Sequence, residues 1–158
     1  MPVRQRTAAD HEAVAAFLAA NNATRAARRG ELTHPLRHPA LVAVDDGGAL
    51  TGVLTYIIDG PSCEILTLHA ATRWTGAGTA LITAIRRLAT DAGCRRLWLI
   101  TTNDNVDALR FYQRRGFHLA ALHRGAVDAS RRSLKPEIPP TGLYAIPLRD
   151  ELELELLL

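Results

Sequence analysis

The residues best suited to chemistry form a short glycine-rich segment, Arg73-Trp74-Thr75-Gly76-Ala77-Gly78. It follows a strand-like apolar run, Ile65-Leu-Thr-Leu68, and precedes the periodic pattern of a helix that we expect to begin near Thr79. The first N–H groups of a helix have no partner within it, and the helix dipole places partial positive charge there. Glycine lets the backbone approach a phosphate closely, and Arg73 adds a cation. The segment therefore predicts a pyrophosphate-binding site.

Three kinds of phosphate-binding loop compete for this assignment. A P-loop requires Lys and Ser/Thr directly after glycine, and this segment has no such lysine. A dinucleotide-binding loop has a third glycine where this chain has Leu81, and an acidic residue after the next strand, which residues 97–102 do not supply. The third pattern, Arg/Gln-x-x-Gly-x-Gly/Ala, is the coenzyme A loop of the GNAT superfamily of N-acetyltransferases, and the segment resembles it.

A second motif favours the third kind of loop. Residues 105–117, Asn-Val-Asp-Ala-Leu-Arg-Phe-Tyr-Gln-Arg-Arg-Gly-Phe, resemble the superfamily's Asn-x-x-Ala-x-x-x-Tyr-x-x-x-Gly-Phe signature at every marked position. The motif lies one strand and one helix after the loop, where that superfamily carries it. Two motifs in the right order are more specific than either alone. The chain therefore resembles the GNAT superfamily over residues 3–127 and in its last strand.

The expected elements follow the order β-α, then a β-meander, then β-α-β-α-β-β. Strands are predicted at 3–6, 41–44, 50–58, 63–68, 97–100, 117–127 and in the leucine–glutamate alternation of 151–156, and helices at 7–22, from 79 to Gly93, and from 106 to Gly116. Residues 23–39 are predicted to be irregular. A strand–helix–strand crossover requires a parallel pair. The fold class is α/β (α+β), a mixed, mostly antiparallel sheet of about seven strands flanked by helices. The resemblance implies that the central parallel strands splay apart.

Composition favours one domain over residues 1–158, because this length can bury a sizeable core. No apolar run approaches the roughly 20 residues of a membrane span, and the N-terminus lacks the pattern of a signal peptide. With only Cys63 and Cys94, the chain is expected to be cytoplasmic. Its net charge of +3 comes with no cluster of aromatic residues, so we predict no nucleic-acid partner. The spacing of histidines and cysteines predicts no metal.

The resemblance implies acetyl-CoA as co-substrate and assigns it a set of residues. These are Leu66, Leu68, Arg73, Trp74, Thr75, Gly76, Ala77, Gly78, Thr79, Ala80, Asn103, Asn105, Ala108 and Tyr112. An unpaired N–H near Leu68 would stabilise the oxyanion. Tyr112 would protonate the departing thiolate, although its spacing also fits the inner face of a helix. Asn105 would contact the pantetheine arm or act only as a helix cap.

The base that deprotonates the amine has three candidates. Glu64 is the preferred candidate, with His69 or water as the alternatives. A solvent-facing strand glutamate is also compatible with the pattern, and a loop position is expected for His69. Because a bulge would change which side chains of this strand share a face, alternation alone does not decide between them.

The acceptor is predicted to be a primary amine of a small molecule. The alternatives are a protein or peptide amine, and a non-catalytic module that binds acyl-CoA. In the superfamily the acceptor site is built from the regions that correspond here to residues 23–39 and 128–149. Arg25, Arg28 and Arg29 would bind an acidic group of the acceptor or remain solvated. The C-terminal strand either completes its own sheet or pairs with a second subunit.

Overall fold

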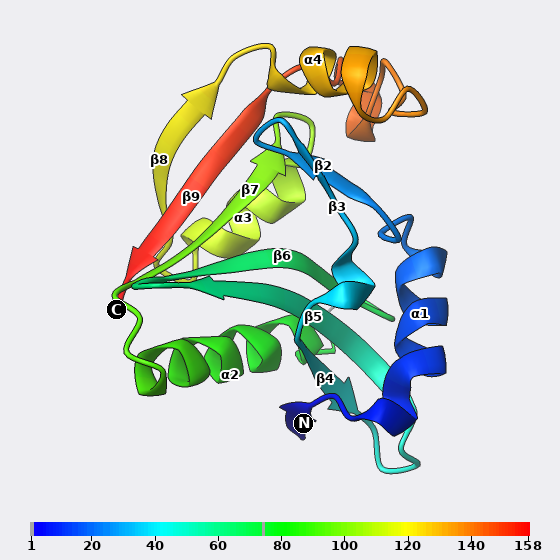
Figure 1. The fold of residues 1–158 in the computed structure, drawn as a ribbon, viewed down its shortest axis with the longest axis vertical. Coiled ribbons are helices and arrows are strands. Elements are labelled where there is room, and N and C mark those ends of the chain that lie inside the picture. Colours follow the sequence, from blue (N-terminus) through cyan, green and yellow to red (C-terminus); the bar gives the residue numbers. More distant parts are fainter. Residues whose placement is uncertain (1, 74) are drawn as a thin grey trace. The chain divides into compact units, whose positions relative to one another are not determined.

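The computed structural model describes residues 2–73 and 75–158, and its elements are drawn in Figure 1. The strands are β1 (Val3–Gln5), β2 (Ala26–Arg28), β3 (Glu31–Thr33), β4 (Ala40–Val44), β5 (Leu50–Asp59), β6 (Ser62–Ala70), β7 (Arg96–Thr102), β8 (His118–His123) and β9 (Glu151–Leu157). The α-helices are α1 (His11–Ala20), α2 (Ala77–Asp91), α3 (Val106–Gln113) and α4 (Ala126–Ser133). Short 3-10 helices occur at Ala8–Asp10, Pro35–Arg37 and Leu143–Ala145.

The chain divides into two units. Unit 1 contains the chain up to Arg25, together with His34–Leu97 and Leu158, and unit 2 contains Ala26–Thr33 and Trp98–Leu157. Within unit 1 the strands follow the order β1-β4-β5-β6, and the three neighbouring pairs are antiparallel. Within unit 2 the order is β7-β9-β8, with β8 and β9 antiparallel, and β2 and β3 form a separate hairpin.

Helices α1 and α2 cover opposite faces of the unit 1 strands (Figure 1). Val14 and Leu18 of α1 form a buried cluster with Val42 of β4 and Val53 of β5. Side chains alternate between the two faces of a strand, so the next position on β5, Gly52, faces α2. A Cβ atom there would come within 2.9 Å of the Leu81 side chain. A residue without a side chain is therefore what lets α2 approach the sheet.

The first helical segment begins with a capping box. Thr7 and Asp10 make the reciprocal bonds, and Arg4 donates to both carboxylate oxygens of Asp10 at 2.7 and 2.9 Å. These hydrogen bonds from Arg4 hold the pKa of Asp10 well below its usual range. Helix α1 ends at Ala20, about two residues before the predicted end.

Two predictions are wrong, namely that residues 23–39 are irregular and that the strand at 117–127 continues to residue 127. Residues 26–33 form the β2–β3 hairpin, whose turn residues Arg29 and Gly30 both have positive φ, 52° and 74°. Such a turn usually has the sequence Asn-Gly. Because arginine takes the first position here, the sequence lacks the pattern that predicts a hairpin. Helix α4 occupies residues 126–133, where the last positions of a strand and an unpatterned connection were expected.

The C-terminal strand completes its own sheet, because β9 lies between β7 and β8. Its leucine–glutamate alternation does not produce one apolar and one polar face. Leu154 is buried as expected, but Glu151 is also buried, with 1% of its surface exposed. Among the described residues, no helix is long and apolar enough to cross a membrane.

Candidate active site

The glycine segment forms the N-terminus of α2, as the sequence predicts. The helix begins at Ala77, two residues before the expected start, and Gly76 is its N-cap with a φ of 86°. This left-handed conformation favours glycine. Apart from its immediate chain neighbours, no atom of the described residues lies within 4 Å of where a Gly76 Cβ would be, so among these residues the space beside it is open. A helix start of this kind, next to open space, suits an anionic group.

The hydrogen bonds of the first turn limit which amides can serve a ligand. Ala80 N–H donates to the Gly76 carbonyl at 2.9 Å, so it already has a partner in the helix. The amides of Ala77 and Gly78 precede this first intrahelical bond, where an α-helix provides no acceptor of its own. We therefore narrow the expected phosphate-binding amides to those before Ala80. Thr75 and Arg73 are exposed on the preceding turn, and Trp74 lies outside the described residues.

Strand β6 holds the candidate base Glu64. It also contains a bulge, a feature whose presence the sequence alone did not decide. Thr55 pairs with Thr67 while Tyr56 pairs with Ile65, which leaves Leu66 as the extra residue. Glu64 is buried, so a solvent-facing glutamate is excluded. His69 is in the strand rather than in a loop, and burial lowers the pKa of its imidazole. A neutral imidazole is able to accept a proton, so His69 remains a candidate base beside Glu64.

The second motif forms α3 in unit 2. Asn105 is its N-cap, and the side-chain oxygen accepts a hydrogen bond from Ala108 N–H at 3.1 Å. The capping interpretation of Asn105 is thus confirmed, while its contact with the pantetheine arm stays a prediction. The helix ends at Gln113, and Gly116 follows with a φ of 94°.

Tyr112 lies on the buried side of α3. Its ring makes edge-to-face contacts with Phe111 and Phe117, with centroids 5.1 and 5.3 Å apart. Burial raises the pKa of its phenol above the ordinary value, and nearby Arg115 opposes this only in part. The phenol therefore stays protonated at neutral pH, which is the form that a proton donor needs.

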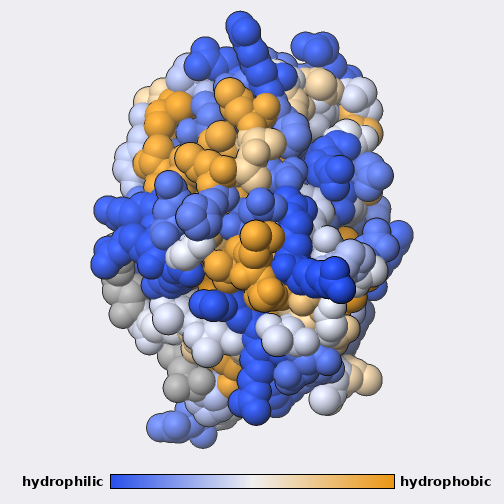
Figure 2. Space-filling view, turned by 90° about the vertical axis from the view of Figure 1, so that its left-hand side faces the viewer, coloured by the Kyte–Doolittle hydropathy of each residue, from blue (hydrophilic) through white to orange (hydrophobic). Residues whose placement is uncertain are grey.

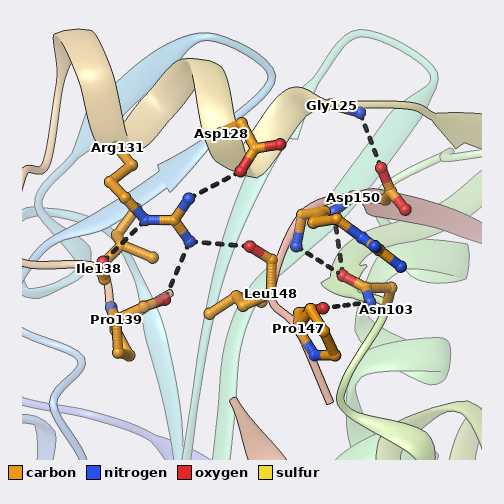
Figure 3. A network of polar contacts seen from close by, with 10 residues as sticks. Asn103, Gly125, Asp128, Arg131, Ile138, Pro139, Pro147, Leu148 and Asp150 are labelled. Atoms are coloured by element: carbon orange, nitrogen blue, oxygen red, sulfur yellow. Dashed lines mark hydrogen bonds and ion pairs between the residues drawn. The ribbon is translucent and has the colours of Figure 1, made fainter. Parts of the chain in front are cut away.

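The Asn103 side chain hydrogen-bonds to the segment that precedes β9, as Figure 3 shows. Its side-chain oxygen accepts hydrogen bonds from the N–H groups of Arg149 and Asp150, and its amide nitrogen donates to the Pro147 carbonyl. Both ends of the amide are thus engaged within unit 2. We expect Asn103 to influence a bound cofactor indirectly, by positioning residues 147–150.

Asp104 anchors the same connection from the other side. It is buried and accepts hydrogen bonds from the Thr102 hydroxyl and from Leu143 N–H. A Cβ at Gly142 would come within 2.1 Å of its carboxylate, so only glycine allows this close approach. The connection between β8 and β9 therefore consists of α4 and a segment that Asn103 and Asp104 hold in place.

Arg131 of α4 is the second anchor of this connection (Figure 3). Its guanidinium donates to the carbonyls of Ile138, Pro139 and Leu148 at 2.8–2.9 Å and pairs with Asp128 at 2.8 Å. The planar, five-donor guanidinium suits this set of acceptors better than an ammonium group would.

We predict that Arg131→Met lowers the free energy of unfolding by about 3 kcal/mol, because it leaves three carbonyls without their donor. Urea denaturation followed by circular dichroism measures this change. Arg132→Met is the matched control, since Arg132 is the exposed neighbour on the same helix. Equal stability of the two variants would contradict the anchoring role of Arg131.

The arginines considered for acceptor binding are partly engaged elsewhere. Arg28 forms an ion pair with Glu31 at 3.1 Å. The Arg29 guanidinium lies 5.1 Å from the centroid of the Trp98 ring. Sequence reasoning missed Glu151 and Ser130, which are buried in the same unit. Neither carries a sequence signal, because an alternating strand and a short polar helix predict exposed side chains at these positions.

Among the described residues, no group of three or more His, Cys, Asp or Glu side chains is placed to hold a metal ion. The absence of a metal cofactor nevertheless stays a prediction. Cys63 and Cys94 are both buried and free, and burial raises the pKa of Cys63 to about 12. A thiol with such a pKa is a poor nucleophile at neutral pH, so neither the sequence nor the structure points to a cysteine mechanism.

Comparisons with known proteins agree with both motifs. A family model described as "Acetyltransferase (GNAT) family" matches residues 8–117. The uncharacterized protein YdhI of Bacillus subtilis is 47% identical over 110 residues, which cover 70% of this chain and 68% of that protein.

Two solved structures show the same fold. An IAA acetyltransferase from Bacillus cereus has a TM-score of 0.73 at 21% identity, covering 99% of both chains. An acetyltransferase from Bacillus subtilis in complex with CoA has a TM-score of 0.65 at 23% identity, covering 77% of this chain and 78% of that chain. These likenesses confirm the predicted fold class, a mixed seven-stranded sheet with one parallel pair and flanking helices.

Proposed function

Because this chain belongs to the acetyltransferase (GNAT) family, we propose that it transfers the acetyl group of acetyl-CoA to a primary amine of a small molecule. Family membership confirms the resemblance drawn from the two motifs and the prediction of an acyltransferase. The identity of the acceptor and the roles of individual residues are proposals. A direct transfer, with both substrates bound together, needs no covalent enzyme intermediate and suits a chain whose cysteines are buried.

The observation that carries the proposal is the start of α2. Gly76 in its left-handed conformation, the amides of Ala77 and Gly78, and open space beside Gly76 fit a pyrophosphate. Arg73 and Thr75 on the exposed turn would add contacts to the phosphates. The resemblance to the family assigns Leu66 and Leu68 of β6 to the pantetheine arm, and it assigns Asn105 and Ala108 of α3 to the same arm. When bound, acetyl-CoA supplies an activated thioester.

The chain's own residues would move the protons. Tyr112 would donate its phenolic proton to the departing sulfur. Its raised pKa makes the donation less favourable than in water, and proximity offsets this cost. Glu64, buried on β6, would receive the amine proton through water, with His69 or water alone as the alternatives. A backbone N–H near Leu68 would stabilise the oxyanion.

Binding of acetyl-CoA to the purified protein tests this function first. We expect calorimetry to show a Kd in the micromolar range, and thiol release to rise when small primary amines are added. Peptides with free N-termini, tested in the same assay, would reveal a protein acetyltransferase if they outperform the small amines. Binding without transfer to any amine would favour a non-catalytic module. A folded protein that does not bind acetyl-CoA would overturn the proposal.

Partners and location follow from the same features. We expect no nucleic-acid or membrane partner and a cytoplasmic location, supported by the two free cysteines.

A homodimer is also proposed, through the surface of β8, which is the last strand in the order β7-β9-β8. Its Leu119 and Leu122 side chains are 55% and 61% exposed. Figure 2 shows hydrophobic side chains exposed on one face of the molecule. Exposed leucines on a strand at the edge of a sheet are typical of a surface that pairs with another chain.

A further inference from the structure

A cavity of about 390 Å³ lies within unit 2, and its lining includes none of the residues that the sequence motifs assign to the cofactor. It is lined by Arg29 and Gly30 of the hairpin turn, by His123 and Glu151 of β8 and β9, and by Ala126, Ala129, Ser130, Ser133 and Leu134 at α4. Its volume is that of a site for a small molecule. We call it the Glu151 cavity, after its most unusual lining residue.

Glu151 is a buried carboxylate without an ion-pair partner among the described residues. One of its oxygens, Oε1, accepts a hydrogen bond from Arg29 N–H at 3.0 Å. A carboxylate accepts about four hydrogen bonds, so most of its capacity is left for a ligand. Burial raises the pKa of Glu151, and the hydrogen bond from Arg29 N–H and the neighbouring His123, Arg28 and Arg29 side chains oppose this only in part. The cavity therefore holds a carboxylate that its own surroundings do not fully compensate.

The nearby cationic and titratable side chains already have other partners. His123 lies 3.3 Å from Glu153, and Arg28 pairs with Glu31. The Arg29 guanidinium is placed over the ring of Trp98. A positively charged group from outside the protein is therefore the best counter-charge for Glu151. A purely apolar ligand would leave the carboxylate uncompensated.

Ser130 supplies a second, independent sign of a ligand. Its hydroxyl is buried and has no hydrogen-bond partner among the described residues. Ser133, three residues later on the same helix, shows the usual alternative, because its hydroxyl donates to the Ala129 carbonyl at 2.9 Å. Ser130 is one of the residues that line the cavity, and a buried hydroxyl without a partner calls for an explanation that a bound molecule would supply.

We propose that the Glu151 cavity binds a protonated amino group of the acceptor, held by the Glu151 carboxylate and the Ser130 hydroxyl. An amine that attacks a thioester must be neutral, whereas a protonated amine has no lone pair. The amino group held here is therefore not the one that is acetylated. The acceptor class is a small molecule with two amino groups, whose spacer packs against Ala126, Ala129 and Leu134. This inference rests on the proposed function.

Binding to the cavity is tested without acetyl-CoA, by titrating the protein with 1,5-diaminopentane and following amide signals by NMR. The Arg29 amide reports on Glu151, because it donates to that carboxylate. We expect its signal to shift with the diamine and not with 1,5-pentanediol. Glu151→Gln keeps an acceptor for Arg29 N–H but removes the charge, and should weaken diamine binding about tenfold or more. Ser130→Ala should weaken it less.

The matched control is Glu155→Gln, which makes the same change on the same strand outside the cavity and should leave diamine binding unchanged. In the transfer assay, KM for 1,5-diaminopentane should be at least about tenfold below KM for 1-aminopentane. Glu151→Gln should remove this difference and leave kcat nearly unchanged.

The outcomes separate the two proposals. Transfer with equal KM values for the two amines, or a preference that survives Glu151→Gln, would overturn the cavity assignment and leave the acetyltransferase function standing. A diamine-dependent shift of the Arg29 amide in a protein that binds no acetyl-CoA would overturn the function and leave the cavity standing as an amine site. A shift produced equally by pentanediol would show that charge is not what the cavity recognises.

Discussion

Gly78→Glu is expected to weaken acetyl-CoA binding by a hundredfold or more, to below detection by calorimetry, while the protein stays folded. The substitution places a carboxylate in the first turn of α2, where we propose that amides meet a pyrophosphate. Like charges repel strongly at such short distances when water is partly excluded. The same carboxylate interacts favourably with the helix dipole, and glutamate has a higher helix propensity than glycine. Loss of binding should therefore come without loss of stability.

Gly78→Gln separates charge from size, because it adds a side chain of similar shape without the negative charge. We expect it to weaken binding much less than Gly78→Glu. Thermal unfolding of both variants would show that the helix is intact. If Gly78→Glu bound acetyl-CoA as tightly as the unmodified protein, the start of α2 would not be the phosphate site.

Tyr112→Phe is expected to lower kcat about a hundredfold and to leave the affinity for acetyl-CoA unchanged. Phenylalanine keeps the ring that packs against Phe111 and Phe117, so only the phenolic proton is lost. General acid catalysis by a positioned side chain contributes about 10²- to 10⁴-fold. Steady-state kinetics with a small primary amine, together with calorimetry, gives both quantities.

The pH profile gives a second measure of the same role. A raised pKa keeps the Tyr112 phenol protonated to higher pH than an ordinary tyrosine, whose pKa is about 10. The rate of the unmodified protein should therefore not fall on the alkaline side until beyond that value. Tyr144→Phe is the control, since Tyr144 is an exposed phenol bonded to Asp107. Turnover that is equal in Tyr112→Phe and the unmodified protein would refute the proton-donor role.

Local patterns in the sequence were sufficient for most of the elements and for both motifs. The Thr7 capping box and the Asn105 cap depend on residues only three positions apart, and both are formed. The start of α2 and the turns at Gly93 and Gly116 depend on glycines with positive φ. Such features are fixed by backbone sterics and nearby hydrogen bonds, so their signals remain visible in a single sequence.

The β2–β3 hairpin and α4 were missed because their local signals are weak. The hairpin turn uses Arg29 where asparagine or aspartate is usual, and its strands have three residues each. Helix α4 is short and polar, with a glycine rather than a side-chain cap at its start. Its stability comes from tertiary contacts, including the Arg131 bonds to carbonyls up to 17 residues away.

The sequence by itself thus determined the family, the order of most elements and the candidate cofactor loop, because these depend on short spacings. Only the tertiary structure decided which polar residues are buried. Alternation on β9 predicts that Glu151 is exposed, yet the hairpin turn and α4, distant in sequence, enclose it with the Ser130 hydroxyl. Burial depends on which segments pack together, and that depends on contacts that no local pattern encodes. The cofactor loop was therefore predictable, whereas the cavity proposed for the acceptor was not.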